Sequence, residues 1–160
     1  MKNNTLKYET KKTEVATEIV FNGAITERSD EVFEEIAKIE DKEIIFNFEG
    51  IEYINSLGIR QWISFLKDFE SNHSITFEKC TVDIVMQINL HSRFVGNSKI
   101  NSFLCDFSCP SCEHELSKLF FPKDGYDKLL TTLAEQDCPS CQTTLIPDVP
   151  EETYLSFLRT

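Results

Sequence analysis

Residues 43–69 read EIIFNFEGIEYINSLGIRQWISFLKDF, and this stretch decides the fold of the first two thirds of the chain. The run Glu43–Phe48 is almost continuously apolar, which is typical of a central strand covered by helices. Residues 49–55 lead away from this strand, and Ser56–Phe69 then has the spacing of an amphipathic helix. The apolar side of this helix carries Ile59, Trp62, Ile63, Leu66 and Phe69. A buried strand that feeds an amphipathic helix is a building unit of α/β folds.

The segments on either side continue the alternation of strands and helices. Further strands are expected at residues 6–14, 15–23, 74–79 and 100–107. One helix begins at Ser29 or Asp30, since both are good helix-starting residues and apolar side chains follow at helical spacing. Another helix is expected at residues 82–90. The order of these elements predicts an α/β fold in which helices pack on a mixed sheet.

The last third of the chain contains the tetrapeptide CPSC twice, once at Cys109–Cys112 and once at Cys138–Cys141. Two CxxC pairs can place four thiolates at the corners of a tetrahedron, which is the geometry of structural zinc. The spacing therefore predicts a small zinc ribbon. The zinc ligands would be Cys109, Cys112, Cys138 and Cys141. Two disulfides or redox chemistry are the alternatives, and a reducing compartment favours the metal. A zinc ion held by four cysteines has no open position for water, so it would stabilise the fold and not catalyse a reaction.

The rest of the tail suits such a ribbon. Within it we expect a strand at residues 115–121, a turn at 122–125 and a short closing helix at 150–158. Glycine or another small residue often follows the second cysteine of a zinc-binding turn, whereas Glu113 and Gln142 stand there in this chain. Cys80 and Cys105 are expected in the core, because free cysteine behaves as a small apolar residue. We expect two domains, at residues 1–105 and 106–160.

Composition limits the classes of function. The 160 residues include 16 basic and 27 acidic side chains, which gives a formal net charge of −11. Such a surface repels phosphate backbones, so nucleic-acid binding is not expected. No apolar stretch has the length of a transmembrane helix or of a signal-peptide core, so we expect a cytoplasmic protein without membrane insertion. The sequence has no Gly-rich phosphate loop, nucleophile motif or cluster of histidine and carboxylates, so we do not expect an enzyme.

The first two thirds of the chain resemble the STAS domain, the fold of bacterial anti-sigma-factor antagonists. That family has an Asp-Ser-x-Gly-hydrophobic motif at the start of a helix after a β-strand, and Asn55-Ser-Leu-Gly-Ile59 stands at this place here. Residues 21–26 resemble the end of an early family strand, and the likeness spans about residues 10–105. The resemblance implies a STAS-like mixed sheet and a signalling module that binds a protein, such as an anti-sigma factor or a kinase-like regulator. The implied contact residues are Asn55, Ser56, Leu57, Gly58 and Arg60.

Ser56 matches the serine that an anti-sigma kinase often phosphorylates in this family. A hydroxyl on the exposed first turn of a helix is accessible, and a phosphate there would change partner contact through its charge. Asn55 stands where the family has aspartate, and the amide keeps the capping ability but loses the charge. If that carboxylate assists phosphoryl transfer, Ser56 would be a poor substrate. The alternative role for Asn55 and Ser56 is helix initiation alone. Gly58 would permit close approach of the helix to the sheet.

Three other functions stand as alternatives. Some stand-alone STAS proteins resemble accessory subunits of membrane transport assemblies, and co-purification with an ATPase would favour that role. A redox protein would cycle its CxxC thiols without releasing metal. A nucleic-acid-binding protein would show salt-sensitive retention on DNA or RNA.

Overall fold

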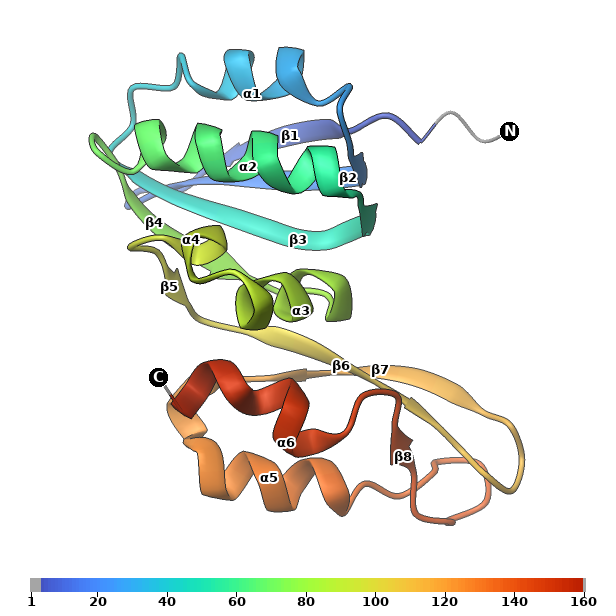
Figure 1. Cartoon of the computed structure of the whole chain (residues 1–160). Coiled ribbons are helices and arrows are strands. Elements are labelled where there is room, and N and C mark those ends of the chain that lie inside the picture. The colour runs from blue at the N-terminus through green and yellow to red at the C-terminus, as the bar shows by residue number, and fades with distance from the viewer. Residues whose placement is uncertain (1–3, 160) are drawn as a thin grey trace.

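The computed structural model describes residues 4–159, and its first part is a five-stranded mixed sheet. The strand order is β1-β2-β3-β4-β5, with β1 antiparallel to β2 and every other neighbouring pair parallel. The strands are β1 (Lys7–Lys12), β2 (Thr17–Ile25), β3 (Glu43–Ile54), β4 (Ser74–Glu78) and β5 (Lys99–Ile100). The helices over this sheet are α1 (Asp30–Ile36), α2 (Ser56–Phe69), α3 (Val82–Leu90) and α4 (Ser92–Val95) (Figure 1). The predicted α/β class with a mixed sheet is confirmed.

The helices cover one face of this sheet because side chains alternate along its strands. Ile19 of β2 lies opposite Phe46 of β3, and both are fully buried beneath the helices. The residues next to Ile19 and Phe46 along their strands project to the opposite face of the sheet. There the Asn47 amide donates a hydrogen bond to the Glu18 carboxylate (2.8 Å), so polar groups satisfy one another where no helix covers them.

Trp62 of α2 joins the helices to the sheet. Its ring is fully buried, and its centroid lies 5.3 Å from that of Phe46 and 5.6 Å from that of Phe48. The indole N–H donates to the carbonyl oxygen of Phe94 (2.9 Å), which holds α4 beside α2. A buried tryptophan needs such an acceptor for its polar atom. Trp62 and Phe69, which the sequence placed on the apolar side of α2, are both buried in the core.

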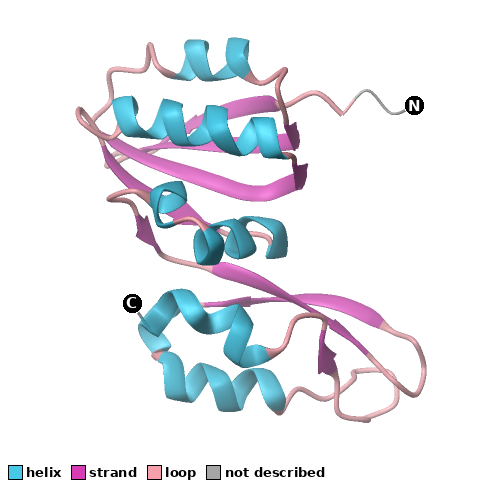
Figure 2. Cartoon of the chain, in the orientation of Figure 1, coloured by secondary structure: helices cyan, strands magenta, loops and turns pink. Residues whose placement is uncertain are grey.

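The second part of the chain is a three-stranded antiparallel sheet with the order β7-β6-β8. Its strands are β6 (Phe103–Ser108), β7 (Glu115–Phe120) and β8 (Ile146–Pro147). The other elements are α5 (Tyr126–Ala134), α6 (Glu151–Tyr154) and the 3₁₀ turns η1 (Pro122–Asp124) and η2 (Leu155–Arg159). Figure 2 shows two loops of this part, the one that joins β6 to β7 and the one between α5 and β8, next to each other at the end of the sheet away from α5 and α6.

The two parts share one continuous hydrophobic core. The Asn89 amide of α3 donates to the carbonyl oxygens of Thr153 (3.3 Å) and Tyr154 (3.0 Å) in α6. Tyr154 is fully buried, and its hydroxyl donates to the carbonyl oxygen of Leu104 in β6. The second part is therefore packed against α3 and not tethered by a free linker.

The predicted elements agree with the structure where the periodicity is strong. The bounds of α2 and α3 match the expected helices residue for residue. The strand expected at 43–48 was too short, because β3 continues to Ile54 and pairs with β2 along its length. The strand expected at 100–107 is split, since β5 ends at Ile100 in the first sheet and β6 begins at Phe103 in the second.

The tail differs more from its expectation than the first part does. Helix α5 was not predicted, although Leu129 and Leu133 lie one turn apart and are buried. The turn expected at 122–125 is the 3₁₀ turn η1, and the closing helix expected at 150–158 is α6 followed by η2. The added helix means that the cysteine-bearing part is larger than a bare β-ribbon.

Candidate functional site

The first CPSC sequence forms the tight turn between β6 and β7. The Cys109 N–H donates to the carbonyl oxygen of His114 (2.8 Å), and the Glu113 N–H donates to the carbonyl oxygen of Cys109 (3.1 Å). Glu113 closes the turn with a φ of 60°, in the left-handed region that glycine enters most easily.

The second CPSC sequence, between α5 and β8, repeats this backbone pattern. The Cys138 N–H donates to the carbonyl oxygen of Thr143 (2.8 Å), and the Gln142 N–H donates to the carbonyl oxygen of Cys138 (2.9 Å). Gln142 has a φ of 65°. Both turns therefore adopt the conformation associated with a following glycine, although each carries a larger side chain, at a cost of roughly 1 kcal/mol per position.

The two turns bring four sulfur atoms together. The Sγ atoms of Cys109, Cys112, Cys138 and Cys141 all lie within 4.8 Å of one another. The Sγ atoms of Cys109 and Cys141 are 3.5 Å apart, as are those of Cys112 and Cys138. A disulfide bond is about 2.05 Å long, and these cysteines are free. Four thiolates about 2.3 Å from a central Zn²⁺ would lie about 3.8 Å from one another. The donor set and its spacing thus fit a tetrahedral Zn²⁺ ion.

The surroundings of the sulfur cluster favour metal ligation. Cys109 and Cys138 are buried, whereas Cys112 and Cys141 are exposed. The Thr143 hydroxyl lies 3.3 Å from the Cys141 Sγ atom, and hydrogen bonds with the side chain and backbone of Thr143 and with Cys109 lower the pKa of Cys141 to about 6. The pKa of Cys112 is instead raised to about 12, because the lowering by the His114 backbone is outweighed by hydrogen bonds with Cys109 and Cys138, so the protons of the cluster gather on one thiol. A thiolate is the form that binds metal. Four cysteine ligands would fill a tetrahedral site and leave no position for substrate.

The remaining two cysteines lie outside this cluster. Cys80 and Cys105 are buried, as predicted. Burial raises the pKa of the Cys105 thiol to about 12, with a smaller contribution from Asp106, and burial also raises the pKa of Cys80. Both side chains therefore stay protonated and act as apolar packing groups.

The second group of predicted site residues lies where β3 meets α2. Asn55 caps α2, because its Oδ1 atom accepts a hydrogen bond from the Gly58 N–H (2.8 Å). The Asn55 Nδ2 group donates to the Glu27 carboxylate (2.8 Å), and this bond lowers the pKa of Glu27. An aspartate at position 55 would have no donor for Glu27 and would place a second negative charge beside it. The amide therefore suits this position better than a carboxylate would.

Ser56 follows the cap and has a free hydroxyl. Its side chain is exposed and makes no hydrogen bond with any residue between 4 and 159. Capping is therefore the role of Asn55, and the Ser56 hydroxyl is not needed for it. The N–H groups of Ser56 and Leu57 are also without partners in the described chain, as the first N–H groups of a helix usually are.

Gly58 brings α2 against the sheet. A Cβ atom at this position would lie 2.2 Å from the carbonyl oxygen of Ile25, at the end of β2. The same carbonyl oxygen accepts the Asn55 N–H (3.1 Å). The expected reason for this glycine, close approach of helix and sheet, is confirmed.

The predicted contact residues differ in their exposure. Ser56, Leu57 and Arg60 are exposed, Asn55 is half-buried and Gly58 is buried. Leu57 is 50% exposed, and Tyr53 at the end of β3 is 45% exposed. Two large apolar side chains thus flank Ser56 in the sequence, and the sequence pattern had not singled out Tyr53.

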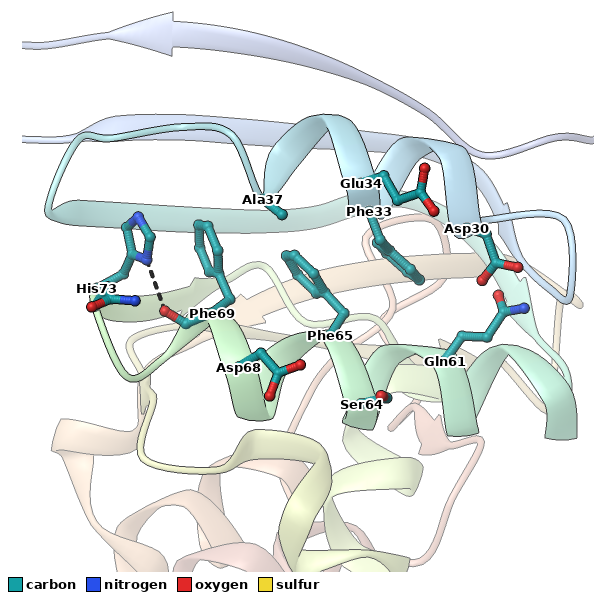
Figure 3. A pocket seen from close by; sticks show the side chains of 11 residues that line it. Asp30, Phe33, Glu34, Ala37, Gln61, Ser64, Phe65, Asp68, Phe69 and His73 are labelled. Atoms are coloured by element: carbon teal, nitrogen blue, oxygen red, sulfur yellow. Dashed lines mark hydrogen bonds between the residues drawn. The ribbon is translucent and has the colours of Figure 1, made fainter.

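A groove between α1 and α2 is lined by aromatic rings, and the sequence did not predict it. The ring centroids of Phe33 and Phe65 are 5.0 Å apart, as are those of Phe65 and Phe69, and both pairs are stacked. Figure 3 shows these rings in a row that ends at His73, whose Nδ1 atom donates to the Phe69 carbonyl oxygen (2.7 Å). The groove has a volume of about 550 Å³. The carboxylates that line it are Asp30, Glu34 and Asp68.

Comparisons with known proteins give little further information. No family model and no curated protein matches the chain. One solved structure that it resembles is an anti-sigma factor antagonist from Mycobacterium paratuberculosis, at 7% identity and a TM-score of 0.48, over 56% of this chain and 80% of that one. A likeness of this size does not establish a shared function. Within residues 4–159, the structure has no helix both long and apolar enough to span a bilayer.

Proposed function

We propose that this chain is a non-enzymatic regulatory module that binds a protein partner at the exposed start of α2 and is switched by phosphorylation of Ser56. The observation that carries the proposal is the free hydroxyl of Ser56 beside an independent cap, Asn55. A serine that only began the helix would use its side chain for capping.

The surface around Ser56 suits a protein partner. Leu57 and Tyr53 are large and exposed, and aromatic and aliphatic side chains of this kind supply much of the binding energy at interfaces. A partner that buries Leu57 and Tyr53 would also remove water from Ser56, which lies between them in the sequence. A phosphate on Ser56 would bring about −2 charges into this surface and oppose that desolvation.

The start of α2 would also accommodate the phosphate itself. The unpaired N–H groups of Ser56 and Leu57 and the positive end of the helix dipole attract an anion. Arg60 lies one turn further along the helix and is exposed, so it could pair with the phosphate. The Glu27 carboxylate opposes these effects, although its bond to Asn55 keeps it engaged.

The partner class follows from the resemblance to the STAS family. We infer an anti-sigma factor or a kinase-like regulator, which could serve both as binding partner and as source of the phosphate. The proposal places the interaction inside the cell, where such regulators act.

The four-cysteine cluster supports a second role, which is structural. We infer that Cys109, Cys112, Cys138 and Cys141 hold one Zn²⁺ ion that stabilises the second part of the chain. The equivalent backbone bonds in the two turns and the sulfur distances support this assignment.

The test is affinity capture from native lysate with the unmodified chain, Ser56→Ala and Ser56→Glu, read by quantitative mass spectrometry. We expect one partner to bind the first two proteins and to be lost, by at least about tenfold, with the third. Phosphate should be found on Ser56 in the chain isolated from cells.

Ser71→Glu is the matched control, because it adds the same charge at an exposed position just past the far end of α2. Equal capture by Ser56→Glu and the unmodified chain would contradict the switch. Co-purification with a membrane ATPase, instead of a regulator, would favour the transport-subunit alternative.

A further inference from the structure

Helix α2 separates two grooves of opposite charge. The groove between α1 and α2 is lined by three carboxylates and by no lysine or arginine. The groove on the other side, between α2 and α4, has a volume of about 480 Å³. We name it the basic groove. It is lined by Arg60, Ile63, Ser64, Lys67, Glu70, Arg93 and Gly96.

One wall of the basic groove is a stripe along α2. Arg60, Ile63 and Lys67 are spaced by three and four residues, so they lie on one side of the helix. Arg60 and Lys67 are seven positions apart, which corresponds to about 10 Å along the helix axis. The stripe therefore offers two positive charges with an apolar side chain between them.

The other wall of the basic groove is α4, which is fixed firmly in place. The bond from Trp62 to the Phe94 carbonyl oxygen holds this short helix against α2. At the end of the groove, the Glu70 carboxylate accepts the Asn97 N–H (2.8 Å). Glu70 is the one carboxylate among the lining residues, and this bond already engages it. The groove is therefore preformed.

The three cations of the groove have no partner in the described part of the chain. Arg60, Lys67 and Arg93 are exposed and take part in none of the ion pairs found among residues 4–159. The whole chain carries a net charge of −11. Three unpaired cations around an apolar side chain, on an otherwise acidic protein, form a local site of charge complementarity for an anion.

We propose that the basic groove binds an acidic segment of the partner protein, with its carboxylates on Arg60, Lys67 and Arg93 and an apolar side chain on Ile63. The inference rests on the proposed function in that it assumes a protein partner. The length and apolar centre of the groove fit an acidic peptide better than a single small anion. The acidic character of the rest of the surface would repel a partner that is acidic throughout and so favours a local acidic segment.

Arg60 connects the basic groove to Ser56. A phosphate four residues before Arg60 can pair with it on the same side of the helix. Phosphorylation would then take one of the three cations from the acidic segment. The groove would therefore bind less tightly when Ser56 is phosphorylated.

The test uses a fluorescein-labelled peptide rich in glutamate and leucine, together with the same peptide carrying glutamine in place of glutamate. We expect the acidic peptide to bind the full chain, to weaken steeply as salt rises, and to shift the NMR amide signals of Arg60, Ile63 and Lys67. The glutamine peptide should not bind.

Charge reversal in the groove, Lys67→Glu with Arg93→Glu, should weaken the acidic peptide at least about tenfold. The matched control is Lys7→Glu with Lys99→Glu, which makes the same change in net charge at exposed positions on β1 and β5. The control should bind as the unmodified chain does. Ser56→Glu should weaken the peptide by roughly threefold through its pairing with Arg60.

Several results would overturn the proposal. Equal loss of peptide binding in the groove variant (Lys67→Glu with Arg93→Glu) and in the control would mean that net charge alone matters. Tighter binding of single-stranded RNA or of phosphatidylserine vesicles by the same cations would show a different occupant. Dimerisation that the groove variant abolishes would identify a second copy, through its acidic groove, as the occupant.

The outcomes separate this inference from the proposed function. If the groove variant still captures the cellular partner while Ser56→Glu does not, the switch stands and the groove inference fails. If the peptide binds in the groove but Ser56→Glu changes neither the peptide nor the partner, the groove stands and the switch fails.

Discussion

The two parts of the chain differ in what holds them together. The first part surrounds Trp62 with fully buried aromatic rings, among them Phe21, Phe46, Phe48 and Phe77. The second part adds a three-stranded sheet whose buried side chains join the same core, and it brings four cysteines together at one end of that sheet. Small units with limited cores usually need a metal or a disulfide. The comparison teaches where to test the proposed zinc ion, because only the second part has a cysteine cluster that could add to the stability of its core.

Loss of one sulfur ligand should give the largest difference between the two parts. Cys138→Ala removes a buried cysteine of the proposed zinc site, so we expect loss of zinc, whose binding contributes on the order of 10 kcal/mol in small zinc-dependent folds. Residues 103–159 should lose their dispersed NMR signals, while the signals of β2 and β3 remain. Cys105→Ala is the control, because it changes a buried cysteine that is not a ligand.

Trp62→Ala should have the reverse effect on the two parts. A cavity at the centre of the first core should lower the free energy of unfolding by about 3–5 kcal/mol, measured by chemical denaturation. The zinc content of the folded variant should stay at one ion per chain. Loss of zinc in parallel with loss of stability would show that the two parts do not differ as described.

Gly58→Ala tests the contact that sets the start of α2. The added Cβ atom would meet the carbonyl oxygen of Ile25, so we expect the free energy of unfolding to fall by about 1–3 kcal/mol. Ser64→Ala, at an exposed position of the same helix, should change it little. A neutral result for Gly58→Ala would mean that the helix can move away from the sheet without cost.

Asn55→Asp tests the amide that joins α2 to Glu27. The lowered pKa of Glu27 means that this bond adds stability above the ordinary carboxyl pKa and loses it as the pH falls through the lowered value. Replacing the donor with a carboxylate should raise the pKa of Glu27 in an NMR titration. Asn72→Asp, an exposed residue beyond the other end of α2, should leave the pKa of Glu27 unchanged.

The smallest effects are expected in the two cysteine turns. Glu113→Gly and Gln142→Gly should each stabilise the zinc-loaded protein by less than about 1 kcal/mol, since glycine adopts a positive φ without strain. Thermal unfolding of the second part would measure this gain. The control, Glu115→Gly, places glycine in strand β7 and should destabilise it instead.

The sequence predicted those features that depend on neighbours in the chain. The spacing of apolar residues gave the bounds of α2 and α3, and the repeated CPSC sequence located the four sulfur atoms that the structure brings together. Both signals are local, because helical periodicity and short ligand spacing act over a few residues.

The features that the sequence missed depend on distant residues. β3 continues past Glu49 because β2 pairs with it there. The sequence does not reveal this continuation, because polar residues interrupt the apolar pattern of the strand. The role of Asn55 depends on Glu27, which is 28 positions away in the chain. Likewise, Arg93 lies far in sequence from Arg60 and Lys67 and joins them only because Trp62 holds α4 beside α2.

Hydrogen exchange during chelation tests the central contrast most directly, because it measures both parts in one experiment. The account predicts one zinc ion per chain before chelation, and afterwards loss of amide protection in residues 103–159 with protection retained in β2, β3 and α2. Absence of zinc, with amide protection of the second part unchanged by the chelator, would contradict it.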